Sequence, residues 1–253
     1  MRHVFITAGG SGLGLAMAKT FMADGATVAV TDMDEAALAT ASASLPGLLT
    51  YEADASCEEA MRDVYADLRS RWGRLDVVMA NAGIAGPTAA IEDVRLEDWR
   101  RCLAVNLDGA FLATSLATPW MKSQADGVIT LTSSTAGLFG YPYRSPYAAA
   151  KWGIIGLTKT LAMELGPHNI RVNAICPGSV EGDRMDRVIA NEAKARGISE
   201  EDLRQGYADC ASLRRFVTAE DVANMALFLA SPAARNVSGM AMTVDGHTEK
   251  VTL

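Results

Sequence analysis

The chain has 253 residues, of which 49% are hydrophobic, and its formal net charge is -7 at pH 7. A chain of this length and composition can bury a substantial core. The acidic balance and the lack of a block rich in Lys and Arg exclude the charge pattern of nucleic-acid-binding proteins and of proteins that bind anionic membranes.

The first residues and the cysteines indicate a cytoplasmic protein. The N-terminus is a strand-like apolar run without the basic head and cleavage site of a signal peptide, and no apolar run approaches the roughly 20 residues that span a bilayer. The four cysteines lack CxxC spacing, and the three histidines lie far apart. We therefore expect reduced thiols, no metal site, no membrane and no nucleic-acid partner.

Short, apolar, β-branched runs recur along the chain and predict buried strands. Longer segments with helical spacing alternate with them, so we expect an α/β fold, a doubly wound parallel sheet flanked by helices with right-handed crossovers. No linker or repeat divides the sequence, which favours one catalytic domain over residues 1–253. The predicted strands cover residues 3–7, 27–31, 48–51, 75–80, 128–132, 172–175 and 241–244.

A glycine-rich turn follows the first predicted strand and precedes an apolar helix. Its sequence is Thr7-Ala8-Gly9-Gly10-Ser11-Gly12-Leu13-Gly14. Such a turn lets backbone N–H groups approach a pyrophosphate at a helix N-terminus. The spacing is not GxGxxG, so a flexible turn is the alternative. The predicted cofactor-binding residues here are Gly10, Ser11, Gly12, Leu13 and Gly14.

Asp32 ends the second predicted strand, roughly 20 residues beyond the glycine turn, where a carboxylate can accept hydrogen bonds from the ribose of an adenosine. The same charge repels a 2'-phosphate, and Met33 and Asp34 follow it instead of Arg or Lys. This favours NAD over NADP, although an ordinary Asp at a strand end is the alternative. Asp54, with Ala55 beside it, ends the third strand and is a candidate for the adenine amino group or for a turn.

Two later segments have apolar residues at helical spacing after a capping residue. One helix is expected to begin after Ser56, with Glu59 completing a capping box, and the other after Thr218. The spaced residues are Met61, Val64, Leu68 and Trp72 in the first, and Val222, Met225, Ala226 and Leu229 in the second.

Tyr147 and Lys151 open a predicted helix that runs to about Leu165, and their spacing places phenol and ammonium on one face. A free phenol titrates near ~10, but a cation within a few ångströms favours the phenolate and lowers its pKa. A tuned phenolate beside a nicotinamide can remove the hydroxyl proton of an alcohol while the carbon loses hydride. The pair alone also occurs by chance.

An insertion at about residues 181–216 interrupts the alternation before the last helix. It is rich in charge and contains two helix-like pieces, residues 184–196 and 199–207. We interpret it as a mobile helical lid over the substrate.

Taken together and in order, these motifs resemble the short-chain dehydrogenase/reductase family over essentially the whole chain. The matching motifs are the glycine turn, Asn81-Ala82-Gly83, Asn106-Leu107-Asp108-Gly109, Ser133-Ser134, Tyr147-x-x-x-Lys151 and Pro177-Gly178. The resemblance implies a Rossmann-type fold with strand order 3-2-1-4-5-6-7, a homotetramer, and a catalytic tetrad of Asn106, Ser134, Tyr147 and Lys151.

In this family scheme, Ser134 binds the substrate oxygen, Lys151 also holds the nicotinamide ribose, and Asn106 supports a proton relay. Ser133 competes with Ser134, but the family spacing and strand alternation favour Ser134. The further residues expected to line the cofactor are Met33, Ala55, Asn81, Ala82, Gly83, Thr132, Pro177, Gly178 and Val180, with Tyr147 and Lys151.

The sequence departs from the family pattern at two positions. Ala8 stands where the first turn glycine usually lies, although Gly9 and Gly10 are expected to keep the turn flexible. Gly182 stands where many relatives have a Thr that contacts the carboxamide of the cofactor, which puts part of the nicotinamide clamp in doubt.

Arg144 lies three residues before Tyr147 in a proline-bounded segment and is a candidate substrate ligand. A guanidinium binds carboxylate or sulfonate through paired hydrogen bonds, and 3-hydroxybutyrate dehydrogenases of the family use a cation at this relative position. An Arg that braces the loop or faces solvent is the equal alternative. In the lid, Arg184 and Arg187 are weaker candidates, and Met185, Val188 and Ile189 are candidates to exclude water.

The sequence thus predicts an NAD-dependent oxidoreductase that interconverts a secondary alcohol and a ketone. The expected substrate is a small hydroxy compound, either anionic or a polyol, that is oxidised. A 3-oxoacyl carrier-type ketoreductase is the second enzymatic hypothesis, and a non-catalytic NAD-sensing module is a third.

Overall fold

Seven parallel strands form one sheet in the computed structural model, which describes residues 2–248. The strand order is β3-β2-β1-β4-β5-β6-β7, as the family resemblance implies. Every predicted strand is present, and the order reverses between β1 and β4, where parallel sheets bind ligands at their carboxyl edge. The strands are β1 (His3–Thr7), β2 (Thr27–Asp32), β3 (Leu49–Glu52), β4 (Val77–Ala80), β5 (Gly127–Thr132), β6 (Ile170–Pro177) and β7 (Ala241–Val244).

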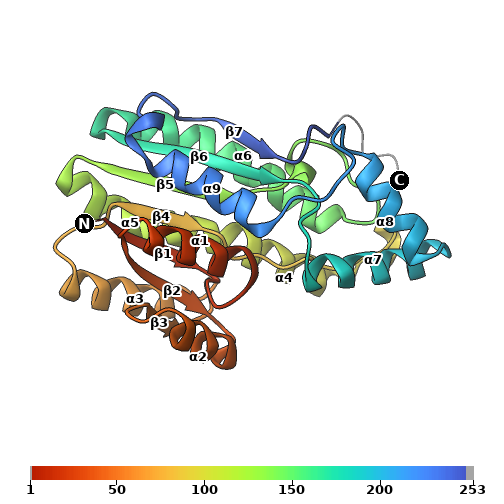
Figure 1. The fold of residues 1–253 in the computed structure, drawn as a ribbon, viewed down its shortest axis with the longest axis horizontal. Helices are drawn as coiled ribbons and strands as arrows, with labels where there is room; N and C mark the ends of the chain where they lie inside the picture. The colour runs from red at the N-terminus through yellow and green to blue at the C-terminus, as the bar shows by residue number, and fades with distance from the viewer. Residues whose placement is uncertain (1, 249–253) are drawn as a thin grey trace.

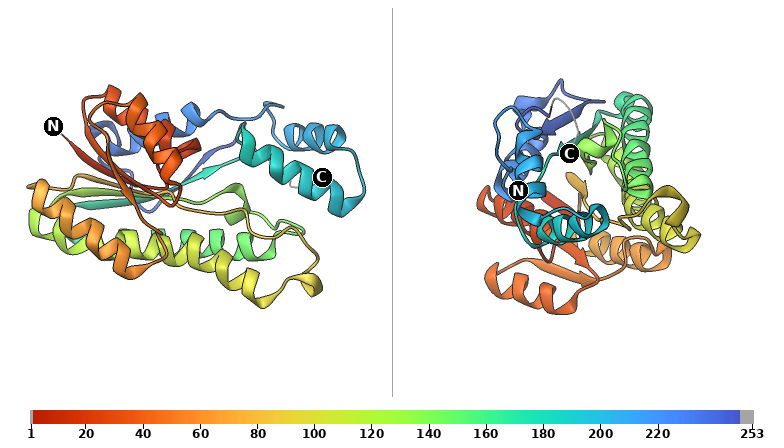
Figure 2. Two further views of the ribbon diagram at one scale, coloured as in Figure 1. Left: turned by 90° about the horizontal axis from the view of Figure 1, so that it is seen from below. Right: turned by 90° about the vertical axis from the view of Figure 1, so that its right-hand side faces the viewer.

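Helices cover both faces of the sheet, and Figure 2 shows the two layers in its left panel. The main helices are α1 (Gly12–Ala23), α2 (Glu35–Ser44), α3 (Glu58–Arg71), α4 (Leu96–Leu103), α5 (Gly109–Gln124), α6 (Ser145–Leu165), α7 (Asp183–Arg196), α8 (Glu200–Asp209) and α9 (Ala219–Ala230). Short helical turns lie at Ile91–Asp93, Ala104–Asp108, Thr135–Gly137, Gly166–His168 and Pro232–Ala234. One core lies between the sheet and α3, α5 and α6, and the other between the sheet and α1, α2 and α9.

The two predicted helix caps had different outcomes. Thr218 caps α9 as expected, and its partner in the capping box is Asp221. The capping box predicted for Ser56 and Glu59 is wrong, because α3 begins one residue later with Cys57 as its N-cap. Asp54 explains the difference, since its carboxylate accepts hydrogen bonds from the Ser56 amide at 2.8 Å and from the Ser56 hydroxyl at 2.7 Å.

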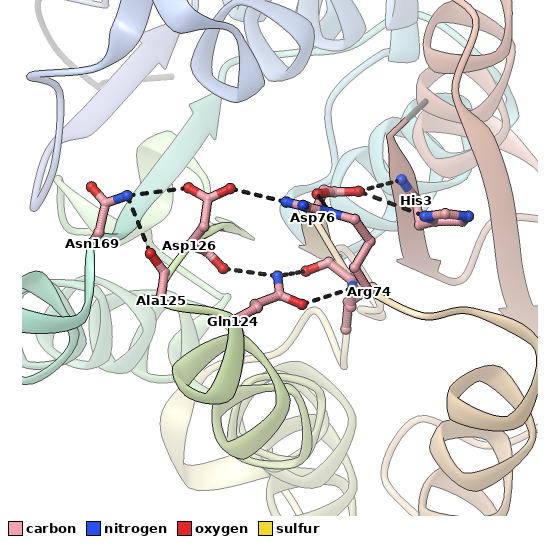
Figure 3. Close-up of polar contacts among 8 residues, drawn as sticks. His3, Arg74, Asp76, Gln124, Ala125, Asp126 and Asn169 are labelled. Atoms are coloured by element: carbon pink, nitrogen blue, oxygen red, sulfur yellow. Dashed lines mark hydrogen bonds and ion pairs between the residues drawn. The ribbon is translucent and has the colours of Figure 1, made fainter.

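A polar cluster fastens the amino ends of four strands, at the edge opposite the glycine turn (Figure 3). Asp76, which is 9% exposed, accepts hydrogen bonds from the His3 amide at 2.7 Å and from Arg74. Arg74 reaches Asp126 at 3.1 Å, and Asn169 bonds the same carboxylate at 3.3 Å. These contacts join the amino ends of β1, β4, β5 and β6. The candidate site lies at the opposite, carboxyl ends of the strands.

The insertion between β6 and α9 contains the two expected helices. Figure 1 shows α7 and α8 beyond the carboxyl ends of the strands, at the right of the view. Val180 and Val217 form a parallel bridge that joins the two ends of the insertion. Within residues 2–248, none of the helices combines the length and apolar character needed to cross a membrane.

Candidate active site

The turn after β1 brings backbone unusually close to backbone. A Cβ at Gly14 would lie 2.0 Å from the Ala8 carbonyl oxygen, and one at Gly9 would lie 2.5 Å from the Val30 side chain. Gly12 has φ +52 and Ala8 has φ 53, in the left-handed region. Ala8 therefore itself adopts a left-handed conformation, which glycine adopts without strain.

Asp32 lies directly against this turn. One carboxylate oxygen accepts a hydrogen bond from the Gly10 amide at 3.0 Å, and the other accepts one from the Asp34 amide at 3.2 Å. Asp34 caps α2 through the Ala37 amide, and Met33 is exposed. The carboxylate thus stands at the carboxyl end of β2, beside the amides expected to face a pyrophosphate.

Asn81, at the end of β4, fastens the glycine turn to the neighbouring strand. Its side-chain amide donates hydrogen bonds to the carbonyls of Thr7 and Ala8, both at 3.1 Å. The Thr7 hydroxyl accepts from the Asn81 and Ala82 amides, both at 2.9 Å. Thr132 extends the contact from β5, with its hydroxyl 3.3 Å from the Asn81 side-chain oxygen. These contacts bring together the residues predicted to line the adenosine side.

Tyr147 and Lys151 lie one turn apart on α6, with the lysine Nζ 5.5 Å from the centre of the tyrosine ring. Lys151 is 2% exposed, and its Nζ donates to the Thr132 carbonyl at 2.8 Å. A Cβ at Gly83 would lie 3.4 Å from that Nζ and 2.6 Å from the Asn106 Oδ1. Asn106 and Lys151 therefore flank the same glycine.

Asn106 lies in a π-helical turn, Ala104–Asp108, between α4 and α5. Its Nδ2 donates to the carbonyls of Ile84 at 3.0 Å and Cys102 at 2.9 Å. Its Oδ1 is buried and has no hydrogen-bond partner. A buried acceptor without a partner calls for a ligand or an ordered water, and π-turns often occur at functional sites.

The two serines after β5 point in different directions, as strand alternation predicts. The Ser133 hydroxyl is buried and donates to the Lys151 carbonyl at 2.9 Å. The Ser134 hydroxyl accepts from the Ala136 amide at 3.2 Å and also forms a hydrogen bond with Tyr147. Ser134 is therefore the serine that faces the phenol.

The charges around Tyr147 favour its phenolate. Burial alone raises the pKa of this tyrosine, but three cations attract the phenolate and leave the pKa below that of a free phenol. These cations are Lys151, Arg184 and Arg144, in order of their effect. Burial in turn lowers the pKa of Lys151.

Arg144 is buried beside the phenol, with its guanidinium carbon 4.8 Å from the centre of the Tyr147 ring and 5% of its surface exposed. One nitrogen donates to the Ala85 carbonyl at 3.1 Å, while Nε is buried without a partner. The guanidinium therefore braces a loop and also faces the Tyr147 ring. Among residues 2–248, no carboxylate forms an ion pair with Arg144, Arg184 or Lys151.

The lid contributes Arg184, whose guanidinium donates to the Gly83 carbonyl at 3.0 Å. Arg187 is exposed. Ile189 packs inside the lid with Ala193 and Leu203, so the expectation that it covers the reacting carbon is not met. The lid interior holds this side chain because two amphipathic helices must bury their apolar faces against each other.

The segment after β6 approaches the sheet edge closely. The Gly178 amide donates to the Val244 carbonyl at 3.0 Å, and a Cβ at Gly178 would lie 2.8 Å from the Asp245 side chain. Pro177 ends β6, and Val180 starts the stem of the lid. Gly182 has φ +124, a backbone conformation that the usual Thr would adopt with strain. In the part of the chain that is described, no group of three or more His, Cys, Asp or Glu side chains can hold a metal ion.

Comparison with known proteins agrees with this arrangement. A family model described as enoyl-(acyl carrier protein) reductase matches residues 7–247. A D-beta-hydroxybutyrate dehydrogenase of Rhizobium meliloti is 36% identical over 248 residues, with 95% of this chain and 96% of the relative covered. The chain belongs to the short-chain dehydrogenase/reductase family.

Other members of the family show the range of related activities. The 3-oxoacyl-[acyl-carrier-protein] reductase FabG of Thermotoga maritima is 34% identical over 245 residues, covering 95% of each chain. The crystal structure of an NAD+-bound xylitol dehydrogenase superimposes with a TM-score of 0.93 at 29% identity, covering 96% of this chain and 97% of that one. This short-chain dehydrogenase/reductase is therefore an oxidoreductase that interconverts secondary alcohols and ketones with a nicotinamide cofactor.

Proposed function

We propose that this enzyme uses NAD to oxidise a small secondary alcohol that carries a carboxylate or sulfonate. The observation that carries the proposal is the cluster of Arg144, Arg184 and Lys151 around Tyr147, which has no carboxylate partner among the described residues. Arg144 and Lys151 are buried and Arg184 is exposed, and buried charge without a counter-charge is costly in a folded protein. A cluster of this kind is expected where the ligand supplies the negative charge.

The residues present fit a dinucleotide. The close approaches at Gly9 and Gly14 leave no room for side chains, so backbone amides line the turn. Asp32 would accept from the adenosine ribose, and its charge opposes a 2'-phosphate. The nicotinamide, when bound, supplies the hydride acceptor. The segment Pro177–Val180 would lie along its ring.

The tetrad would then handle the proton. Ser134 would donate a hydrogen bond to the substrate oxygen, and the Tyr147 phenolate would accept the hydroxyl proton as the C–O bond gains double-bond character. Lys151 stabilises the phenolate and would also bind the nicotinamide ribose. Asn106 would bind a water at its unpaired Oδ1, from which the proton leaves the site.

Arg144 would bind the anionic group of the substrate through Nε. That nitrogen is buried and unpaired, while Nη2, on the same edge of the guanidinium, donates a hydrogen bond to the Ala85 carbonyl. A guanidinium fixed at one nitrogen, with Nε still unpaired, suits a charge-assisted hydrogen bond to a carboxylate or sulfonate. Arg184, on the lid, would complete the positive lining of the pocket.

The test is NADH formation by the purified protein with matched panels of hydroxy acids, hydroxysulfonates and neutral polyols, each with NAD and NADP. We expect turnover with NAD and a preference for the anionic compounds. Asp32→Ala should relax the preference for NAD over NADP, because the charge that opposes the 2'-phosphate is lost. An unchanged cofactor ratio in that variant would remove the ribose assignment, and neutral substrates alone would remove the anionic one.

The reductase reading has one observation in its favour, the 34% identity with a 3-oxoacyl-[acyl-carrier-protein] reductase. Asp32 opposes the 2'-phosphate of NADPH, so it argues against a reductase that uses this cofactor. Reduction of a 3-oxoacyl thioester with NADPH at rates above those of alcohol oxidation with NAD would favour this second function.

We also propose that the enzyme is a homotetramer in the cytoplasm. Phe111 on α5 and Trp152 and Met163 on α6 are 53%, 51% and 81% exposed, and large exposed apolar side chains on these helices suit contact with a second copy of the chain. Cys57, Cys102 and Cys176 form no disulfide, as expected in a reducing compartment. Light scattering of the native protein and of Trp152→Glu would test the interface.

A further inference from the structure

The lid contains a buried carboxylate that takes no part in the mechanism above. Glu192, on α7, is 3% exposed. One of its oxygens accepts a hydrogen bond from the Tyr207 hydroxyl of α8 at 2.6 Å, and the other accepts one from Arg196 at 3.1 Å. Burying a carboxylate is costly unless its partners are well placed, and an apolar side chain would fill the same space at lower cost. A functional role of this contact would account for that cost.

Tyr207 also contacts Tyr141, a residue outside the lid. Its ring stacks on that of Tyr141, with centroids 6.5 Å apart and planes 19° from parallel, and the two hydroxyls share a hydrogen bond. Tyr141 lies in the segment that leads into α6, and it packs against the apolar interior of the lid, next to Ile189 and Leu203. The core of the lid is therefore completed by a side chain from the catalytic side of the site.

The segment that carries Tyr141 is a strained turn ending at Arg144. The Arg144 amide bonds the Tyr141 carbonyl at 3.4 Å, and between them Tyr143 has φ 61. A tyrosine adopts this left-handed conformation at an energetic cost, so surrounding contacts must hold it. The Ala89 amide provides one such contact, since it donates to the Tyr143 carbonyl at 3.0 Å.

We propose that Glu192 is a positioning residue for Arg144: through Tyr207 and Tyr141 it holds the strained turn that sets this guanidinium against Tyr147. The anion site is then complete only when the lid is closed. The part of the inference that concerns substrate rests on the proposed function, because it takes Arg144 as the ligand of the substrate anion. The relay itself, from Glu192 to the turn, does not.

The fold of the lid does not depend on Glu192. An ion pair between Asp186 and Arg204 also joins α7 to α8, and the bridge between Val180 and Val217 closes the stem. Apolar contacts add to these. Loss of the Glu192 contact should therefore loosen the turn while the two helices stay paired.

The relay is tested by amide hydrogen exchange in the intact protein, with Tyr207→Phe and Glu192→Gln as the variants. Tyr207→Phe removes one oxygen and keeps the ring, and Glu192→Gln keeps the size of the side chain. Glu201→Gln, an exposed change of the same chemistry on α8, is the matched control. We expect the Ala89 amide to exchange about tenfold faster in the two variants, reflecting local opening of the turn, and to be unchanged in the control.

Two exchange results would overturn the relay. One is an Ala89 amide protected equally in all four proteins. The other is a rise in exchange that is as large at the β5 amides as at Ala89, which would show a loss of global stability instead. Tyr207→Phe carries the test if Glu192→Gln does not fold.

Steady-state kinetics test the consequence for substrate binding. Tyr207→Phe should lower the ratio of kcat/KM for a hydroxy acid over a neutral alcohol by about tenfold, mainly through KM, and should lower it no further in an Arg144→Ala background. Equal losses on both substrates would contradict the positioning role. If the unaltered enzyme shows no preference for anions but Ala89 exchange responds as expected, the proposed substrate class is wrong and the relay stands.

Discussion

The acid-base behaviour of Tyr147 depends on cations that belong to three different segments. Lys151 shares its helix, Arg144 ends the turn before that helix, and Arg184 belongs to the lid. Each cation lowers the pKa of the phenol against the effect of burial. The chemistry of one oxygen is thus set by contacts from distant parts of the chain.

Alcohol oxidation should therefore rise with pH. In the proposed reaction the Tyr147 phenolate is the base, so kcat/KM should increase as pH passes upward through the lowered pKa of Tyr147 and level off above it. Lys151 keeps that pKa low, and so does Arg184, so Arg184→Gln should move the rise to higher pH. Tyr147→Phe should lower kcat by roughly 10²–10⁴-fold at every pH while NADH still binds, as fluorescence titration would show. A pH profile that is the same in Arg184→Gln and in the unaltered enzyme would contradict this assignment.

Ala8 should be replaceable by glycine with a gain in stability. The left-handed backbone costs a non-glycine residue about 1–2 kcal/mol, and part of this is offset because glycine has a more flexible unfolded state. Ala8→Gly should raise the free energy of unfolding by up to about 1 kcal/mol, measured by urea denaturation. Gly14→Ala should do the reverse, since its Cβ would meet the Ala8 carbonyl; a destabilised Ala8→Gly variant would show that the turn relaxes in solution.

Residue spacing predicted part of the site and missed the rest for identifiable reasons. It distinguished Ser134 from Ser133 because alternation along a strand is a local property. The unpaired Oδ1 of Asn106 depends on a π-turn, which the local residue pattern does not reveal. The burial of Arg144 depends on a left-handed tyrosine held by tertiary contacts, so the sequence left substrate binding and loop bracing as equal alternatives.

At the scale of helices and strands, apolar periodicity predicted the elements better than it predicted their ends. All seven strands lie where β-branched runs occur, and α7 and α8 fill the predicted lid. The start of α3 was wrong because Asp54 competes for the Ser56 groups that a cap would use. Glu192 and Tyr207 could not be paired from the sequence, because their contact depends on how two amphipathic helices rotate against each other.

The cap of α9 gives a prediction at this scale. The Thr218 hydroxyl accepts a hydrogen bond from the Asp221 amide at 3.2 Å, and the Asp221 carboxylate accepts one from the Thr218 amide at 2.8 Å. Thr218→Ala should lower the free energy of unfolding by about 1 kcal/mol, because it leaves an amide of the first turn without its partner. Chemical denaturation should show this loss, and Thr218→Ser should restore most of it. Equal stability of the two variants would mean that the capping box contributes nothing.

At the scale of the whole molecule, the amino ends of the strands are held by structural contacts and the carboxyl ends carry the candidate site. Polar contacts among Asp76, Arg74 and Asp126 join the amino ends of the strands, while the glycine turn, Asp32 and the proposed tetrad lie at the carboxyl ends. The lid adds a positive residue across this edge through the bond between Arg184 and the Gly83 carbonyl. A sheet fixed at the amino ends of its strands and a lid of two joined helices at their carboxyl ends are compatible with the proposed small, charged substrate.

The most direct measurement compares NAD reduction with a hydroxy acid and with its amide, which match in size but differ in charge. The account predicts that kcat/KM for the acid exceeds that for the amide by at least about tenfold, and that Arg144→Ala abolishes this difference while turnover of the amide persists. Equal rates for acid and amide, or a preference for the acid that survives Arg144→Ala, would contradict it.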